Sequence, residues 1–219
     1  MGTAYDAIVF DNDGVLTTPT DYDVLIDAVH DAFVSVGVPE PPTDHVETLI
    51  SPDVPTLRRV ANEHGLEPNE LWNARERAAI DAQLEEMRAG RKRPYDDVAA
   101  LVALETPTAI VSNNQHRTIE NVLEEFELTE YGFDIWYGRE PTVRGIERKK
   151  PTPYYLESAI EELGASNPLY VGDSQVDVLA ADNAGVDSAF IRRDHRLDYE
   201  LSVEPEYEIE SLSVLPNLV

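Results

Sequence analysis

The sequence predicts an α/β protein with a Rossmann-like parallel sheet core and an inserted helical cap domain. Short β-rich segments alternate with helical patterns from residue 95 onward, which is typical of parallel strands joined by crossover helices. Between the first two predicted strands, residues 19–93 show only helical periodicity, and this stretch is too long for an ordinary connection. We therefore expect residues 1–18 and 94–219 to form the core and residues 19–93 to form the cap.

The predicted core strands are short apolar runs rich in β-branched residues. In chain order they are Ala7–Phe10, Thr108–Asn113, Phe133–Gly138, Pro168–Asp173 and Ser188–Arg193. The predicted core helices are Tyr95–Leu104, Gln115–Phe126, Thr152–Leu163 and Val176–Ala184. The last stretch, EYEIESLSVLPNLV, predicts an edge strand followed by a short helix. A parallel sheet of this kind binds ligands beyond the carboxyl ends of its strands.

The predicted cap contains apolar residues at helical spacing. In YDVLIDAVHDAFVSVG, Val29, Phe33 and Val36 lie three or four residues apart, as on one face of a helix. The stretches VPTLRRVANEHG and PNELWNARERAAIDAQLEEMRAG continue this pattern, and Pro and Gly mark their boundaries. We therefore predict a cap formed from helices alone.

Acidic residues dominate the charge balance. Asp and Glu number 43 against 17 Lys and Arg, which gives a formal net charge of -26. The acids are spread along the chain, so we interpret them as a solvated surface that repels nucleic acid and anionic membranes. Only three of the basic residues are lysine. A lysine-poor acidic surface is typical of proteins that work in concentrated salt, where the screening length falls to about 3 Å at 1 M. We therefore hypothesise a halophilic protein.

The composition also restricts the redox chemistry and the location. The chain has no cysteine, which excludes disulfides and thiolate metal sites. The segment MGTAYDAIVFDND lacks the basic and apolar regions of a signal peptide, and no apolar stretch approaches the ~20 residues that span a bilayer. We therefore expect a cytoplasmic protein without nucleic-acid or membrane partners. No oligomeric state follows from the sequence.

Two aspartates stand at the end of the first predicted strand, in VFDNDGVLT. Residues i and i+2 of an extended segment point the same way, so Asp11 and Asp13 can face one point beyond the strand. Gly14 permits the tight turn that follows. An N-cap role for the next helix would explain one of the two aspartates but hardly both.

Polar residues follow other predicted strands in the same way. Ser112 lies at the tip of the second strand, where Asn114 is expected to cap the following helix. Asp173 follows LYVG, and Ser174 with Asp177 has the spacing of a capping box. Lysine is almost wholly replaced by arginine in this chain, so its retention at Lys150, directly before Pro151, suggests that a compact ammonium is needed there.

The carboxylates of Asp11, Asp13 and Asp173 are expected to meet at one edge of the sheet. Two carboxylates about 5 Å apart repel by about 3 kcal/mol at an effective dielectric near 20, so three cost roughly 10 kcal/mol. This cost is comparable to the stability of a whole domain, so a cation is required. Oxygen ligands favour Mg²⁺, which would attract a phosphate that Lys150 and Ser112 can bind. One aspartate would then be a nucleophile and the other a proton carrier.

These motifs resemble the haloacid dehalogenase-like superfamily of phosphotransferases. The resemblance rests on DNDGV at residues 11–15, the serine of VSN at 112, a lysine before proline at 150, and GDSQVD at residues 172–177. DNDGVL, GDSQVDVLAADNAG and the placement of the helical insert also resemble the phosphoglycolate phosphatase and β-phosphoglucomutase branch.

The resemblance implies a role for each acidic residue. Asp11 would attack phosphorus, and Asp13 would protonate the leaving oxygen and then deprotonate the water that hydrolyses the intermediate. Asp11, the backbone carbonyl of Asp13, Asp173 and Asp177 would be the Mg²⁺ ligands, Asp177 directly or through a water molecule. Because true dehalogenases lack an acid at the position of Asp13, carbon–halogen cleavage is not expected.

The resemblance also implies that Ser112, Asn113 and Lys150 bind the phosphoryl group. Two positions depart from the family pattern: Asn12 replaces an apolar residue or methionine, and TTPTDYD replaces the usual acidic segment after the first motif. Asp21 or Asp23 would have to substitute for that acid.

The sequence therefore predicts an Mg²⁺-dependent phosphatase that acts on a small phosphorylated metabolite through an aspartyl-phosphate. A phosphosugar mutase of the same family is the main alternative. A receiver-type signalling protein fits less well, because receivers lack the insert and the second acid, and a non-catalytic relative would not need all of these residues. The candidates for recognising the leaving group are Tyr22, Arg58, Arg59 and Arg91–Arg93.

Overall fold

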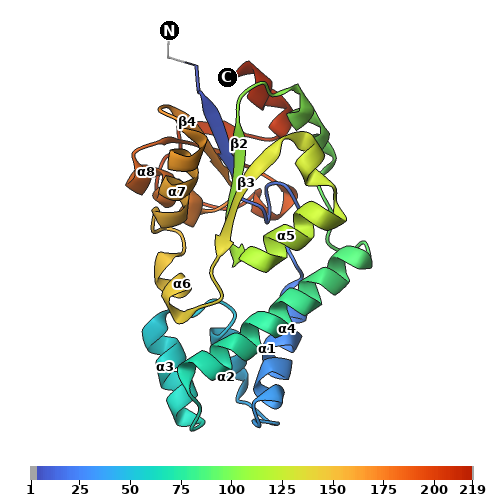
Figure 1. Ribbon diagram of the computed structural model, residues 1–219, viewed down its shortest axis with the longest axis vertical. Coiled ribbons are helices and arrows are strands. Elements are labelled where there is room, and N and C mark those ends of the chain that lie inside the picture. Colours follow the sequence, from blue (N-terminus) through green and yellow to red (C-terminus); the bar gives the residue numbers. More distant parts are fainter. Residues whose placement is uncertain (1–3, 219) are drawn as a thin grey trace.

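The computed structural model describes residues 4–218 and contains a six-stranded, all-parallel sheet (Figure 1). The strand order is β3-β2-β1-β4-β5-β6. The strands are β1 (Ala7–Phe10), β2 (Thr108–Gln115), β3 (Phe133–Arg139), β4 (Pro168–Gly172), β5 (Asp187–Ile191) and β6 (Tyr207–Ile209). The predicted α/β class and the C-terminal edge strand are confirmed.

Alternate residues of the central strands point to opposite faces of the sheet and enter two separate cores. On one face, Ile8 and Phe10 pack with helix α5 (His116–Glu125), η1 (Asp96–Ala103) and η4 (Leu212–Asn217). On the other face, Val9 packs with α7 (Tyr154–Leu163) and α8 (Gln175–Ala184). A strand that is buried on both faces explains the continuous apolar run AIVF.

Residues 19–93 contain four helices and no strand, as predicted. They are α1 (Tyr22–Ser35), α2 (Thr43–Thr48), α3 (Val54–Glu63) and α4 (Pro68–Arg88), and their apolar faces form a third core. Figure 1 shows them at the end of the molecule toward which β2 and β3 point. The two connections to the sheet lie side by side, because Thr18 N donates to Arg93 O at 2.9 Å.

Two elements differ from the sequence prediction. The predicted helix at 95–104 is the 3₁₀ helix η1, because i,i+3 spacing buries Val98 and Leu101 in either helix type. Helix α6 (Val143–Arg148) was not predicted, since six residues are too few to show an apolar period. Its N-cap, Thr142, accepts a hydrogen bond from Gly145 N. Among the described residues, no helix combines the length and the apolar character needed to cross a membrane.

Candidate active site

Neighbouring strands bring the predicted acids to one edge of the sheet. Phe10 of β1 pairs with Val171 of β4, and Asp11 N donates to Val171 O at 2.8 Å. Asp11 therefore leaves its strand beside Asp173, which follows β4. Asp177 comes from the first turn of α8, where it forms the predicted capping box with Ser174.

Asp11, Asp173 and Asp177 form a compact buried group, which we call the acidic cluster. Each offers a carboxylate oxygen, and these oxygens all lie within 4.8 Å of one another. Two glycines make room for them. A Cβ on Gly14, whose φ is +81°, would collide with the Asp173 carboxylate, and a Cβ on Gly172 would collide with Asp177. The expectation that the Asp13 carboxylate meets those of Asp11 and Asp173 is wrong, because Lys92 and Asn114 hold it outside this group.

Lys150 is the cation within the acidic cluster. Its Nζ lies 2.9 Å from Asp11 Oδ1 and 2.5 Å from Asp177 Oδ1, and the side chain is 3% exposed. Burial raises the pKa of Asp11 to about 7, and Asp177 and Asp173 add to the rise while Lys150 opposes it. Lys150 and the partly exposed Arg196 are the two permanent positive charges that contact these three carboxylates, so the group keeps a net negative charge when all three are ionised. Its oxygen donors fit a divalent cation.

A second set of contacts covers the outer side of Asp173. His195 Nε2 and Arg196 Nε lie 2.8 and 2.9 Å from Asp173 Oδ2. Both residues are partly exposed and follow β5 in the short helix η3 (Asp194–Arg196). An ion that used this oxygen of Asp173 would have to share it with these side chains or displace them.

Asp13 is held by different partners. Its carboxylate forms an ion pair with Lys92 and accepts a hydrogen bond from Asn114 Nδ2 at 2.9 Å. Lys92 is 1% exposed and also donates to Thr18 O at 3.0 Å. Burial alone would raise the pKa of Asp13, but Lys92 and Asn114 hold it below its usual value.

The prediction that Asn114 caps the following helix is wrong. Helix α5 has Gln115 at its N-cap, without a side-chain cap hydrogen bond. Asn114 instead connects Asp13 to the helical insert, because its Nδ2 donates to Asp13 Oδ2 at 2.9 Å and to Gln83 Oε1 on α4 at 2.6 Å. This pairing crosses between segments far apart in sequence, so helix-capping preferences did not reveal it.

Ser112 and Asn113 lie at the tip of β2, next to β1. Ser112 Oγ accepts from Asn114 N at 3.2 Å. The side chain of Asn113 forms two hydrogen bonds with the backbone of Lys150. Its Oδ1 accepts a hydrogen bond from Lys150 N at 2.7 Å, and its Nδ2 donates one to Lys150 O at 3.1 Å. In this geometry Asn113 positions Lys150, and its binding of phosphate stays a prediction.

All three lysines of the chain lie in this region. Lys150 contacts Asp11, Lys92 contacts Asp13, and Lys149 lines an adjoining cavity. The sequence analysis singled out Lys150 on the rarity of lysine and placed Lys92 only within a basic run. The same rarity applied to Lys92 would have marked it as a functional candidate.

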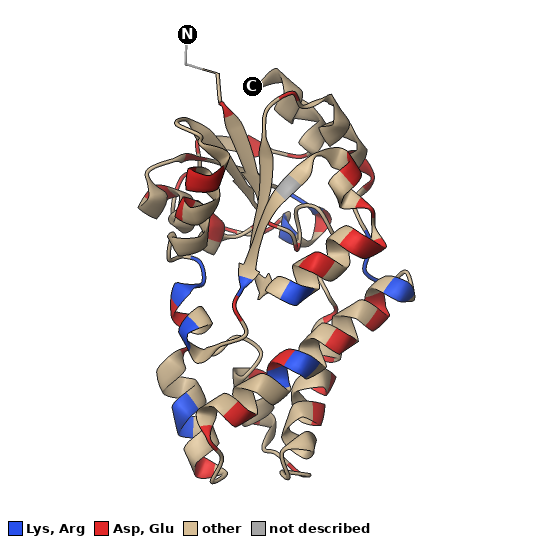
Figure 2. Ribbon diagram, in the orientation of Figure 1, with Lys and Arg blue, Asp and Glu red and all other residues tan. Residues whose placement is uncertain are grey.

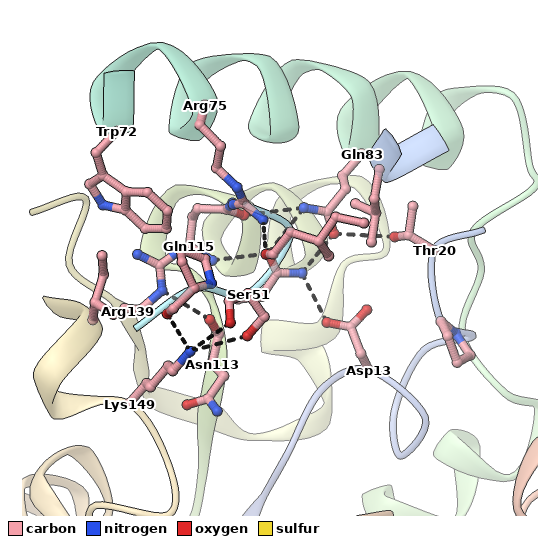
Figure 3. A pocket seen from close by; sticks show the side chains of 16 residues that line it. Asp13, Thr20, Ser51, Trp72, Arg75, Gln83, Asn113, Gln115, Arg139 and Lys149 are labelled. Carbon is pink, nitrogen blue, oxygen red and sulfur yellow. Dashed lines mark hydrogen bonds between the residues drawn. The ribbon is translucent and has the colours of Figure 1, made fainter. Parts of the chain in front are cut away.

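A cavity of about 250 Å³ lies beside Asp13, between helix α4 and the tips of β2 and β3 (Figure 3). Its polar lining includes Arg75, Arg139 and Lys149. Tyr22, Arg58 and Arg59 do not line it, so their predicted contact with the leaving group is not supported by its geometry. All three side chains are exposed. The cation that lines the cavity from the helical insert is the buried Arg75, which the spacing of apolar residues could not reveal.

The chain is similar to known phosphatases. It is 29% identical over 188 residues to phosphoglycolate phosphatase from Neisseria gonorrhoeae, covering 82% of this chain and 76% of that protein. It is 32% identical over 128 residues to pyrophosphatase PpaX from Halalkalibacterium halodurans, covering 57% of each protein. CbbY from Rhodobacter sphaeroides, solved in complex with phosphate, shares the fold, with a TM-score of 0.70, 18% identity and 96% coverage of both chains.

A family model covers most of the chain. Residues 5–185 match the haloacid dehalogenase-like hydrolase model. The family resemblance expected from the motifs is therefore confirmed, and the chain belongs to the haloacid dehalogenase-like hydrolase family.

Proposed function

We propose that this protein is an Mg²⁺-dependent phosphatase that hydrolyses a small phosphorylated metabolite through an aspartyl-phosphate on Asp11. The observation that carries the proposal is the acidic cluster around Lys150, with a second acid, Asp13, two residues after the nucleophile. The phosphatase names of the two curated relatives support this reaction class.

The acidic cluster would hold the metal. Asp11, Asp173 and Asp177 supply oxygen ligands, and the backbone carbonyl of Asp13 is a further candidate. When bound, Mg²⁺ would offset negative charge on the phosphoryl oxygens. Lys150 would do the same from the other side, and Ser112 would donate a hydrogen bond to the phosphoryl group.

The reaction proceeds in two steps. First, a carboxylate oxygen of Asp11 forms a bond to phosphorus, the bond from phosphorus to the leaving oxygen breaks, and protonated Asp13 gives that oxygen a proton. Second, ionised Asp13 takes a proton from water, whose oxygen attacks phosphorus while the Asp11–phosphorus bond breaks. Because Lys92 and Asn114 lower the pKa of Asp13, its ionised form predominates near neutral pH, and this form suits the second step.

Residues 19–93 would act as the cap, with the paired segments at Thr18 and Arg93 as its hinge. Closure would exclude bulk water from the intermediate. The cavity beneath α4, of about 250 Å³, lies below the roughly 300–1,000 Å³ typical of drug-sized ligands, which favours a short leaving group over a sugar bisphosphate and hence a phosphatase over a mutase. Cytoplasmic location and a high-salt habitat stay predictions.

Phosphate release from p-nitrophenyl phosphate tests the proposal. We expect activity with Mg²⁺, loss of activity with a chelator, and recovery on adding Mg²⁺ back. Asp11→Asn should abolish turnover, whereas Asp44→Asn, an exposed carboxylate on α2, should not change it. Asp13→Asn should still form phosphoenzyme from this substrate, whose leaving group needs no proton, and should then stall.

Three results would contradict the proposal. They are turnover that persists in Asp11→Asn, activity that is indifferent to chelator, and conversion of a sugar phosphate to its isomer without release of inorganic phosphate. The last would identify a mutase.

A further inference from the structure

Three cations from separate elements converge on the cavity next to Asp13. Arg75 comes from α4, Arg139 ends β3, and Lys149 follows α6. Arg75 is 5% exposed and Arg139 is 4% exposed, and Lys149 is partly buried. We call these three residues the basic cluster. Figure 2 shows basic residues along α6 and at the lower tip of β3, near the cap.

A single buried carboxylate, that of Glu76, forms ion pairs with two residues of this cluster. Glu76 Oε1 lies 2.9 Å from Arg75 Nη1 and 2.9 Å from Arg139 Nη2, so one oxygen is shared between two guanidinium groups. The remaining contacts are with neutral oxygens: Lys149 Nζ donates to Pro52 O at 2.9 Å, and Arg75 Nη2 donates to Ile50 O at 2.5 Å. Arg75 and Arg139 therefore share one buried carboxylate, while the carboxylate that acts on Lys149 is the exposed Asp53.

The cations also repel one another. Burial lowers the pKa of Lys149, and Arg139 and Arg75 lower it further. Burial likewise lowers the pKa of Arg75, with a contribution from Arg139. A group that carries negative charge in the cavity would relieve this repulsion.

Trp72 provides an independent sign of a missing acceptor. Its ring packs against both guanidinium groups, with Arg139 Cζ 4.7 Å and Arg75 Cζ 5.3 Å from the ring centroid. The side chain is 2% exposed and lines the cavity. Within residues 4–218, its Nε1–H has no hydrogen-bond partner. Buried polar groups are normally satisfied, so this donor lacks an acceptor that a ligand oxygen could supply.

The cavity is placed to receive the leaving group of a substrate. In Figure 3, Asp13 lies on one side of it, with Arg139 and Lys149 on the other. A phosphoryl group at Asp11 and Lys150 would have its leaving oxygen next to Asp13, and the rest of the molecule would extend toward the cations. With about 250 Å³ available, that remainder is short.

We propose that the basic cluster and Trp72 form an anion subsite for a second negative charge, a carboxylate or a second phosphate, on the leaving group. This inference rests on the proposed phosphatase function. It assigns the substrate class as short phosphate esters or anhydrides with two anionic ends, and it assigns Arg75, Arg139 and Lys149 to specificity.

A matched pair of substrates tests the subsite. Phosphoglycolate and 2-hydroxyethyl phosphate have the same length and differ in a carboxylate against a neutral hydroxymethyl group, and pyrophosphate supplies a second phosphate. With Mg²⁺, we expect kcat/KM for phosphoglycolate or pyrophosphate to exceed that for 2-hydroxyethyl phosphate by about 10–100-fold, the range for hydrogen bonds between charged groups. Whichever anionic substrate is preferred identifies the second anion.

Variants test whether the preference for anionic substrates arises from the basic cluster. Lys149→Met should lower kcat/KM for the preferred anionic substrate by about 10-fold and leave 2-hydroxyethyl phosphate unchanged. Arg77→Gln, an exposed cation on the same helix as Arg75, should change neither. Arg139→Gln, checked for an unchanged fold by circular dichroism, should act in the same direction as Lys149→Met. Equal kcat/KM values for the neutral and anionic substrates, or equal effects of Lys149→Met and Arg77→Gln, would overturn the subsite.

Direct binding separates the subsite from the reaction. The chain has two tryptophans, so Trp136→Phe leaves Trp72 as the only one. Glycolate and pyrophosphate should change Trp72 fluorescence with saturation, and Lys149→Met should weaken that binding. If no substrate is hydrolysed, the proposed function fails while saturable binding still supports the subsite. If hydrolysis occurs but neither anion changes the fluorescence, the subsite is wrong and the function stands.

Discussion

The acidic and basic clusters repeat one arrangement with opposite signs. In the acidic cluster, Lys150 lies between Asp11 and Asp177; in the basic cluster, Glu76 lies between Arg75 and Arg139. In each, a single buried counter-charge contacts two partners, and the third like charge has a more exposed counter-charge, Arg196 for Asp173 and Asp53 for Lys149. Such a group is incomplete without a ligand, a cation in the first case and an anion in the second.

The two clusters differ in how they are anchored. The acidic cluster belongs wholly to the sheet core, because its residues follow β1, follow β4 or begin α8. The basic cluster is divided, with Arg75 on α4 and Arg139 at the end of β3. The proposed catalytic site is therefore built by the sheet core alone, whereas the proposed anion subsite is complete only when helix α4 and the sheet are correctly placed. Catalysis and selection are assigned to different parts of the molecule.

Removing the counter-charge of the acidic cluster should have the largest effect on stability. Lys150→Met leaves three buried carboxylates without their ammonium, and we expect a loss of about 3–5 kcal/mol in the free energy of unfolding without metal. Urea unfolding measures this loss. Added Mg²⁺ should restore much of it; a variant as stable as the parent in chelator would show that the cluster carries no excess negative charge.

The mirror-image change is Glu76→Gln. It removes the counter-charge of the basic cluster and should cost about 3 kcal/mol, because buried guanidinium groups lose their carboxylate. Here inorganic phosphate or sulfate, and not Mg²⁺, should recover stability. The melting temperatures of both variants, measured with each ion, give the comparison directly. If Mg²⁺ but not phosphate raised the melting temperature of Glu76→Gln, the opposite ligand preference of the two clusters would be contradicted.

The pH dependence of stability should also distinguish the acidic cluster from the basic one. The pKa of Asp11 is raised to about 7 in the folded state, above the ordinary value near 3.9, so the folded protein binds more protons than the unfolded chain between these values. Metal-free stability should therefore fall as pH rises from about 4 to 7. Saturating Mg²⁺ should flatten this slope, and Asp11→Asn should remove most of it. A slope identical with and without Mg²⁺ would contradict metal binding at this cluster.

A smaller effect is expected at Asp13. Lys92→Met removes the cation that lowers the pKa of Asp13, so that pKa should rise. The basic limb of the kcat/KM profile, which reports the protonated Asp13 that the first step needs, should move to higher pH with it. Arg93→Gln, the exposed neighbour, serves as control. A profile that shifts equally in both variants would assign the effect to general surface charge.

The smallest effect per residue concerns the exposed acids outside both clusters. If the protein is adapted to high salt, molar KCl should raise the melting temperature by screening their mutual repulsion. Maximum stability in dilute buffer would refute that adaptation, whereas the responses of the two clusters to Mg²⁺ and phosphate would stand.

The sequence correctly predicted that Asp11 and Asp173 meet, wrongly placed the Asp13 carboxylate with them, and did not predict the basic cluster, for a physical reason. Asp11 and Asp173 directly follow apolar strands, and parallel strands end at a common edge, so local patterns predicted their meeting. Arg139 and Glu76 are 63 residues apart and lie on different elements. No local pattern links them, and buried polar residues on α4 obscure the apolar stripe that marks a packed face.

The same limit applied around Asp13. The motif DNDGV predicted a proton carrier at this position, but Lys92, 79 residues later, sets its charge state. Asn114 was assigned to a helix cap because its position in sequence suited one, and the structure pairs it with Asp13 and Gln83. Motifs predicted the candidate reactive residues, and only the tertiary contacts showed which side chains set their charge state.

The three lysines have a practical consequence. Lys92 and Lys150 are almost fully buried, and only Lys149 is partly accessible. Apart from the α-amino group, an acylating reagent should therefore mark one side chain, and peptide mass spectrometry can read its extent. Because that amine lines the proposed anion subsite, the rate of labelling becomes a measure of occupancy that needs no turnover.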